Sequence, residues 1–258
     1  MMTGWSFPQY TALRQLLITS RLRLPTKSMC VIDPEWNNNV KFESKMTLAD
    51  HKAMNDFLNA TTAKSREPGR VHMGYEHIYE RDSFRPLSKL GQQVLPKALQ
   101  QHQSRHREPK IRITHENAKG KNPVRKAAIV KVNVDNLHIF NPRHNYDCRI
   151  SINLEVNLLG RTDLADFESL ISHDDKGTPQ VDRIKDRLSY KHLAYSIDLT
   201  KVVTGDLASY ELELEVDSNV LREQMGNIKQ RKPDAYGDVV SGFVDNAVFL
   251  MRQVPESK

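Results

Sequence analysis

The chain has 258 residues, of which 38% are hydrophobic and 27% are charged, and its formal net charge is +6. This composition excludes a disordered chain, and the excess of Lys and Arg favours an anionic partner such as nucleic acid or a polyphosphate. No apolar run approaches the ~20 residues of a membrane span, and the two distant cysteines predict no disulfide framework. We therefore expect an intracellular protein with no membrane segment, built as one large domain.

Helical patterns occur in the part of the chain before Lys110. The sequence TLADHKAMNDFL predicts a short amphipathic helix over residues 47–58, capped by Thr47. A polar loop is expected over residues 61–70. A second helical candidate covers residues 86–103, where Gly91 and Pro96 interrupt it.

From Lys110 to Val216, apolar and polar residues alternate with a period of two, which is typical of strands. The segments with this pattern are KIRIT, IVKVNVDNL, RISINLEV, RIKDRLSY, YSIDLTKV and YELELEVD. After Asp217 the period becomes helical, first in a segment capped by Ser218 and then in an apolar stripe of Val240, Phe243, Val244, Ala247, Leu250 and Met251. We expect these helices to cover the apolar side of the sheet.

The polar faces of two predicted strands carry rows of like charges. One row is Arg183, Lys185 and Arg187, and the other is Glu211, Glu213 and Glu215. A sheet with its polar face in water is the simpler interpretation of any single strand. Rows of like charge on a solvated face repel one another, whereas across a closed space they can pair and organise an anion and a metal. We therefore predict a barrel of about eight strands with a charged lumen.

The predicted lumen has the side chains that phosphoryl transfer requires. Its cations are Arg112, Lys131, Arg183, Lys185 and Arg187, which would focus positive potential on an anionic substrate. Carboxylates beside them are the hard oxygen ligands that Mg²⁺ and Mn²⁺ prefer. The sequence contains no glycine-rich loop of the usual nucleotide folds, and no HExxH or paired CxxC spacing that would indicate zinc.

Five segments of the sequence resemble those of a known protein family. They are KIRIT, NLHIFNPRHNYDCRISINLEVN, RIKDRLSYKH, YSIDLTKV and YELELEVD. In this order they resemble the fungal RNA 5′-triphosphatases, the β subunits of the yeast-type mRNA-capping enzyme, in the triphosphate tunnel metalloenzyme family. The resemblance covers residues 29–250. It implies a β-rich α+β fold, an antiparallel eight-stranded tunnel with covering helices, and removal of the γ-phosphate from the 5′-triphosphate end of nascent pre-mRNA, the first step of capping.

The resemblance also implies which cations would bind the substrate. Arg112, Lys185 and Arg187 would grip the phosphate, and Lys131 and Arg183 would line the tunnel nearby. Two further polar positions, Asp198 and Thr200, would support these basic residues through hydrogen bonds.

The acidic residues would have two different roles by the same resemblance. Glu155 would orient or deprotonate the attacking water. Glu213 and Glu215 would bind Mg²⁺ or Mn²⁺, Glu215 most directly, with Glu211 on the same face.

The N-terminal part departs from the family pattern. Relatives begin the tunnel with a strand whose Glu-x-Glu pair completes the metal site, but this chain has Glu-x-Glu only in YELELEVD and no glutamate before Glu35. We therefore expect one tunnel strand to be missing and the metal to be weakly held. Residues 1–22 are interpreted as an atypical N-terminal segment, arising from truncation or an incorrect gene start, and residues 23–258 as the tunnel domain.

Two other functions remain open at this point. A catalytically impaired tunnel domain, without a complete metal site, would bind RNA ends or the guanylyltransferase. Another tunnel-family phosphatase would act on inorganic polyphosphate or small triphosphates. The resemblance implies the guanylyltransferase as a partner, a homodimer formed through the outer barrel wall, and a location in the nucleus.

Overall fold

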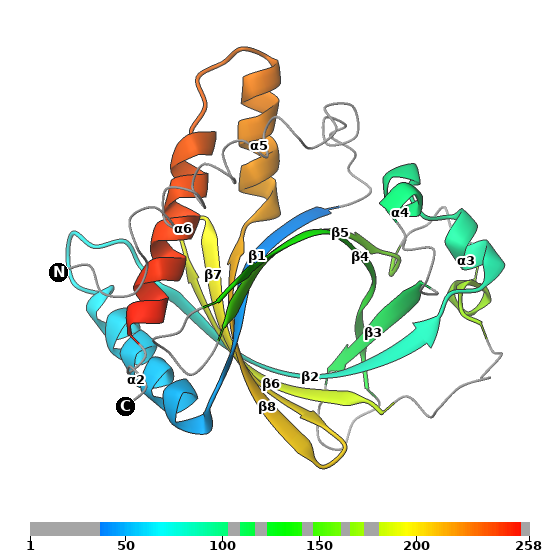
Figure 1. Ribbon diagram of the computed structural model, residues 1–258, viewed down its shortest axis with the longest axis horizontal. Helices are drawn as coiled ribbons and strands as arrows, with labels where there is room; N and C mark the ends of the chain where they lie inside the picture. Colours follow the sequence, from blue (N-terminus) through cyan, green and yellow to red (C-terminus); the bar gives the residue numbers. More distant parts are fainter. Residues whose placement is uncertain are drawn as a thin grey trace.

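The computed structural model describes residues 37–102, 109–116, 123–140, 147–160, 166–172 and 181–253. The predicted N-terminal segment 1–22 lies outside these residues. The strands are β1 (Asn37–Met46), β2 (Gly74–Pro86), β3 (Lys110–Glu116), β4 (Arg125–Ile139), β5 (Cys148–Asn157), β6 (Arg183–His192), β7 (Tyr195–Thr204) and β8 (Leu207–Val216). They close into an antiparallel barrel in the order β1, β5, β4, β3, β2, β6, β7, β8 (Figure 1).

Closure of the barrel depends on β1, which lies between β5 and β8. Lys41 lies opposite Ser151 of β5 and opposite Glu215 of β8, and β1 pairs with β5 over residues 37–44 and with β8 over residues 41–46. The expectation that a tunnel strand is missing was therefore wrong. The strand that closes the barrel is present and lies after Glu35, and it carries Lys41 and Glu43 at alternate positions instead of a Glu-x-Glu pair.

Six strands match the segments predicted from alternation, whereas β1 and β2 were not predicted. In β2, polar residues occupy both faces, and Tyr75 and Tyr79 on one of them are exposed. A strand without an apolar face has no period-two signal in its hydrophobicity.

The helices are α2 (Leu48–Lys64), α3 (Lys89–Gln93), α4 (Lys97–His102), α5 (Ser218–Lys229) and α6 (Tyr236–Arg252), with a 3₁₀ turn η1 (Phe167–Leu170). The predicted Thr47 cap is confirmed, because its side chain accepts a hydrogen bond from the amide of Asp50. The helix continues to Lys64, so the expected loop begins later than predicted. Pro96 separates α3 from α4 as expected, and Asp217 rather than Ser218 caps α5.

Two apolar cores lie outside the barrel wall rather than inside it. Helices α2, α5 and α6 lie on one side of the barrel, and α3 and α4 lie on the opposite side (Figure 1). The larger core includes Phe42, Leu199, Leu212, Leu214 and Phe243, and the smaller core lies around β3, β4 and β5. All six residues of the predicted α6 stripe are buried. Because the apolar faces of the strands point outward to these helices, the polar faces point into the lumen.

Among the described residues, no helix is long and apolar enough to cross a membrane.

Candidate active site

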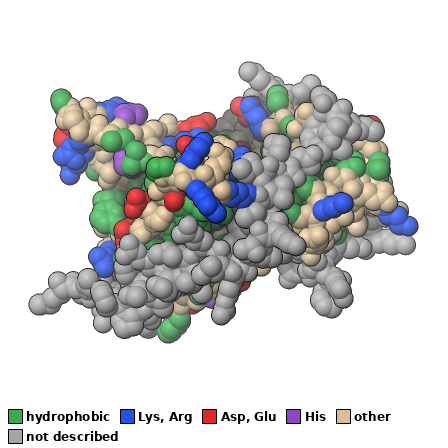
Figure 2. Space-filling model, turned by 90° about the horizontal axis from the view of Figure 1, so that it is seen from above, with side chains coloured by type: hydrophobic (Ala, Val, Ile, Leu, Met, Phe, Trp, Pro, Cys, Tyr) green, Lys and Arg blue, Asp and Glu red, His purple; other side chains and the backbone are tan. Residues whose placement is uncertain are grey.

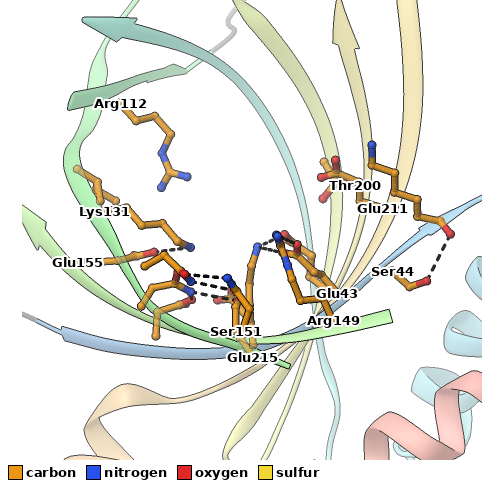
Figure 3. Close-up of a pocket in the computed structure, with 18 of the residues that line it drawn as sticks. Glu43, Ser44, Arg112, Lys131, Arg149, Ser151, Glu155, Thr200, Glu211 and Glu215 are labelled. Carbon is orange, nitrogen blue, oxygen red and sulfur yellow. Dashed lines mark hydrogen bonds and ion pairs between the residues drawn. The ribbon is translucent and has the colours of Figure 1, made fainter. Parts of the chain in front are cut away.

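One cavity of about 1720 Å³ occupies the lumen of the barrel. All nine predicted site residues line it, namely Arg112, Lys131, Glu155, Arg183, Lys185, Arg187, Glu211, Glu213 and Glu215. They come from β3, β4, β5, β6 and β8, and alternation along each strand directs every second side chain inward. Figure 3 shows Arg112 projecting into this space near Lys131 and Glu155. The structure therefore brings the predicted residues into one place.

The most buried cation of the lumen is Lys185, which forms an ion pair with Asp82 of β2. Asp82 also accepts a hydrogen bond of 2.6 Å from the hydroxyl of Thr114. Burial lowers the pKa of Lys185, although the Asp82 carboxylate acts in the opposite direction. For the Asp82 carboxyl the directions are opposite: burial alone would raise its pKa, but Lys185 and Thr114 lower the pKa below its ordinary value. Each group thus favours the charged form of the other inside the wall.

Three lumen arginines, Arg112, Arg149 and Arg187, have guanidinium donors unused by the described part of the chain, and two of them lie on the cationic walls. The Nε atoms of Arg112 and Arg187 are buried and have no hydrogen-bond partner among the described residues. A terminal nitrogen of Arg187 lies 3.4 Å from a carboxylate oxygen of Asp198. Burial raises the pKa of Asp198, and Arg187 partly offsets this effect. Buried donors without partners are costly unless a ligand accepts from them, so this side of the lumen is suited to an anion.

A second pair of opposite charges lies on the neighbouring wall. Lys131 of β4 is directly opposite Glu155 of β5, and its Nζ lies 2.9 Å from Glu155 Oε1 (Figure 3). Arg183 of β6 lies 3.8 Å from Glu211 of β8. These pairs leave both the cations and the carboxylates at the surface of the cavity, where a substrate can contact them.

The acidic floor of the cavity consists of Glu43 on β1 and Glu213 and Glu215 on β8. Glu43 is directly opposite Glu213, and Lys41 is directly opposite Glu215. Burial would raise the pKa of Glu213, but the Lys41 ammonium and the more distant Arg187 lower it to about 2. The pKa of Glu215 is raised by burial and by the neighbouring Glu213.

We tested whether this floor fits the expected divalent ion. Carboxylate oxygens are the correct ligand type for Mg²⁺ or Mn²⁺. However, no three metal-ligating side chains come together anywhere in the part of the chain that the structure describes. The Lys41 ammonium lies 2.8 Å from Glu43 Oε2 and also pairs with Glu213. The floor as arranged therefore holds a protein cation, and it does not fit a divalent ion.

Sequence reasoning missed four charged residues that pair within the site: Lys41, Glu43 and Arg149, which line the cavity, and Asp82, which is buried in the wall beside Lys185. Lys41 and Glu43 lie in a strand that was not predicted, and Asp82 lies in β2. Arg149 lies in a predicted strand and pairs with Glu43. The sequence of β1 does contain the alternation that predicts a strand, since Val40 and Phe42 alternate with Asn39, Lys41 and Glu43.

The comparisons with known proteins agree with this geometry. A family model described as "mRNA capping enzyme, beta chain" matches residues 15–256. The chain belongs to this family. The mRNA-capping enzyme subunit beta of Schizosaccharomyces pombe is 29% identical over 240 residues, which are 91% of this chain and 69% of the relative. The corresponding subunit of Cryptococcus neoformans is 25% identical over 91% of this chain, and the match spans about half of that relative, 52%.

Solved structures of the family have the same fold. The S. pombe RNA triphosphatase, in complex with the Spt5 CTD, matches with a TM-score of 0.63 and 22% identity, covering 95% of this chain and 93% of that structure. A second structure of the S. pombe RNA triphosphatase matches with a TM-score of 0.61. The predicted triphosphate-tunnel fold, an eight-stranded antiparallel barrel with helices outside, is confirmed.

Proposed function

We propose that this protein is a polynucleotide 5′-phosphatase that removes the γ-phosphate from the 5′-triphosphate end of nascent pre-mRNA. The observation that carries the proposal is the convergence of all five predicted cations and all four predicted carboxylates on one lumen cavity, where the buried Nε donors of Arg112 and Arg187 have no partner among the described residues. Membership of the capping enzyme β chain family supports the same reaction. The products are a diphosphate RNA end and inorganic phosphate.

The substrate phosphates bind to the cationic walls. Arg112 and Arg187 donate from Nε and the terminal nitrogens to phosphate oxygens, a geometry for which the planar guanidinium is suited. Lys185 adds a point charge beside them, and its pair with Asp82 fixes its position. Cations that neutralise the equatorial oxygens stabilise the charge that develops during phosphoryl transfer.

Glu155 acts on the attacking water. Its carboxylate orients the water and accepts its proton as the water oxygen attacks the γ-phosphorus. The bond from the γ-phosphorus to the bridging oxygen breaks, and the electron pair leaves with the β-phosphate. Lys131, 2.9 Å from Glu155, holds the carboxylate in place, and Arg183 lines the tunnel nearby.

The proposal extends to cofactor, partners and location. We propose dependence on Mg²⁺ or Mn²⁺, with Glu213 and Glu215 as ligands and Glu211 on the same face, which requires that the ion displace the Lys41 ammonium from the floor. Partners are 5′-triphosphate RNA, the mRNA guanylyltransferase and a second copy of the chain, and the location is the nucleus. The net charge of +6 favours RNA, and Figure 2 shows Lys and Arg side chains grouped near the middle of the described part of one face.

The experiment is release of labelled γ-phosphate from 5′-triphosphate RNA in manganese, with tripolyphosphate as a competing substrate. The wild-type chain should release phosphate from RNA ends, and a Glu213→Ala, Glu215→Ala double variant should not. A folded wild-type chain that binds RNA ends without releasing phosphate would identify a binding module instead. Release from tripolyphosphate alone would identify a small-triphosphate enzyme.

A further inference from the structure

Lys41 lies at the centre of the acidic floor of the lumen. On β1 and β8, the register places Glu43 opposite Glu213 and Lys41 opposite Glu215, so these two strands bring one cation and three carboxylates together on a small area of the inner wall. The side chains of Lys41, Glu43 and Glu213 are 12%, 22% and 13% exposed. The charges are therefore largely shielded from bulk solvent, and each strongly affects the others.

Three of the six carboxylate oxygens of the floor are already paired with protein cations. The Lys41 ammonium lies 2.8 Å from Glu43 Oε2 and pairs with Glu213 Oε1. Arg149 pairs with the other oxygen of Glu43, Oε1 (Figure 3). Glu43 thus has a protein cation on each of its two oxygens, and one oxygen of Glu213 is also bonded.

We propose that Lys41 is an internal counter-ion that sets the affinity of this tunnel for divalent cations. A divalent ion that binds the floor must displace the ammonium from Glu43 and Glu213, and it then lies close to a displaced like charge. The inference deepens the proposed function, since it concerns the cofactor of the same site. It also explains the disagreement between the metal that the family implies and a floor that does not fit one.

The alternative is that Lys41 is only a structural ion pair that holds β1 against β8. In that case, neutralising Lys41 would lower stability and leave the affinity for metal unchanged. Measuring both the metal affinity and the stability of a Lys41 variant therefore separates the two possibilities.

The test is a titration of the full chain with Mn²⁺ in the absence of RNA, with free Mn²⁺ measured by electron paramagnetic resonance. Lys41→Gln removes the charge and keeps most of the side-chain length. Lys45→Gln is the matched control, because it removes one positive charge from the same strand at an exposed position that also lines the cavity. We expect Lys41→Gln to bind Mn²⁺ at least about tenfold more tightly than the wild type, and Lys45→Gln to change the affinity by less than about threefold. Equal affinities of Lys41→Gln and the wild type would overturn the proposal.

A second variant keeps the test decisive if Lys41→Gln does not fold. Lys41→Glu adds a fourth carboxylate, and a bound ion stabilises the folded state by mass action. The melting temperature of Lys41→Glu should rise with Mn²⁺ concentration more steeply than that of the wild type. A rise no steeper than the wild type's would overturn the proposal.

These measurements do not depend on catalysis. A wild-type chain that releases no γ-phosphate, together with tighter Mn²⁺ binding by Lys41→Gln, would refute the proposed function and support the role of Lys41. Normal release of γ-phosphate by the wild type, together with unchanged Mn²⁺ binding by Lys41→Gln, would support the proposed function and refute the role of Lys41.

Discussion

Lys185 of β6 and Asp82 of β2 form an ion pair in which the side chains are only 7% and 0% exposed. The two strands are neighbours in the barrel, and Asp82 is directly opposite Arg183. Because Thr114 of β3 also donates to Asp82, this carboxylate connects three adjacent strands. The pair therefore affects both the stability of the barrel and the position of a cation in the site.

Replacing Asp82 with Asn should lower the free energy of unfolding by about 3–5 kcal/mol at pH 7, because it leaves the buried Lys185 charge without its partner. The measurement is urea denaturation. Asp186→Asn is the control, since Asp186 is on the outer face and its partners His77 and Tyr79 are exposed. A loss no larger than that of Asp186→Asn would contradict the role of the pair.

The loss of stability caused by Asp82→Asn should depend on pH. The pKa of Asp82 is lower in the folded protein than the ordinary value of 3.8, so the folded state binds fewer protons than the unfolded state near that pH. The stabilisation is then fully present above about pH 5, where the unfolded Asp is ionised, and is lost as the pH falls through the folded pKa. The difference between wild type and Asp82→Asn should stay constant from pH 7 to about pH 5 and shrink only below that value. Urea curves across this range would measure it, and a difference that shrinks already at pH 6 would contradict the assignment.

Arg112→Ala should lower kcat for γ-phosphate release by roughly 10²–10³, the usual effect of removing one donor to a transition-state charge. Its stability should change little, since Nε makes no hydrogen bond within the described residues. Arg81→Ala is a suitable control, because Arg81 is half-exposed and pairs loosely with Asp182 at 3.7 Å. An unchanged kcat in a folded Arg112→Ala would remove this residue from the site.

Glu155→Gln should lower kcat by roughly 10²–10⁴, because the amide cannot accept the proton of the attacking water. Binding of 5′-triphosphate RNA should persist, since the phosphate-binding cations remain. The matched control is Glu168→Gln, whose carboxylate is on η1 outside the barrel and pairs with Arg125. Steady-state kinetics with RNA substrate would show the change, and wild-type kcat in Glu155→Gln would exclude the proposed base.

Two glycines of α6 should respond in opposite ways to replacement by Ala. A Cβ on Gly242 would collide with the Tyr195 hydroxyl, which donates to the carbonyl of Val239. A Cβ on Gly237 would meet nothing within 4 Å. Gly242→Ala should therefore destabilise the protein by about 1–3 kcal/mol, whereas Gly237→Ala should be neutral or stabilising by up to about 1 kcal/mol.

Thermal and urea denaturation would measure both glycine variants. Adding Tyr195→Phe to Gly242→Ala removes the contacting hydroxyl and should restore part of the loss. If Gly242→Ala is as stable as Gly237→Ala, α6 does not pack against β7 as described.

The sequence was most informative where one face of a strand is covered by a helix. In β8 and β5, residues such as Leu212 and Leu154 are buried against the outer cores while Glu213 and Glu155 face the lumen, so alternation was plain. In β2, Tyr75 and Tyr79 on the outer face are exposed, and apolar and polar residues do not alternate along the strand. Where the outer face is uncovered, hydrophobicity carries no signal for a strand.

The acidic floor could not be predicted for a different reason. Glu43 and Glu213 become neighbours only when β1 and β8 close the barrel, and their positions are 170 residues apart in the printed sequence. We expected the Glu-x-Glu strand before Glu35 and did not consider a later strand, such as β1, with Lys at one of the two positions. Likewise, the partner of Lys185 depended on the pairing of β2 with β6, which a local pattern does not reveal.

The most direct measurement follows RNA labelled separately at its γ- and α-phosphates and incubated with the full chain in manganese. Removal of the γ-phosphate inside the tunnel predicts that the γ label appears as inorganic phosphate while the α label remains on an RNA with a diphosphate end. Release of pyrophosphate, or no release by a chain shown to be folded, would contradict it.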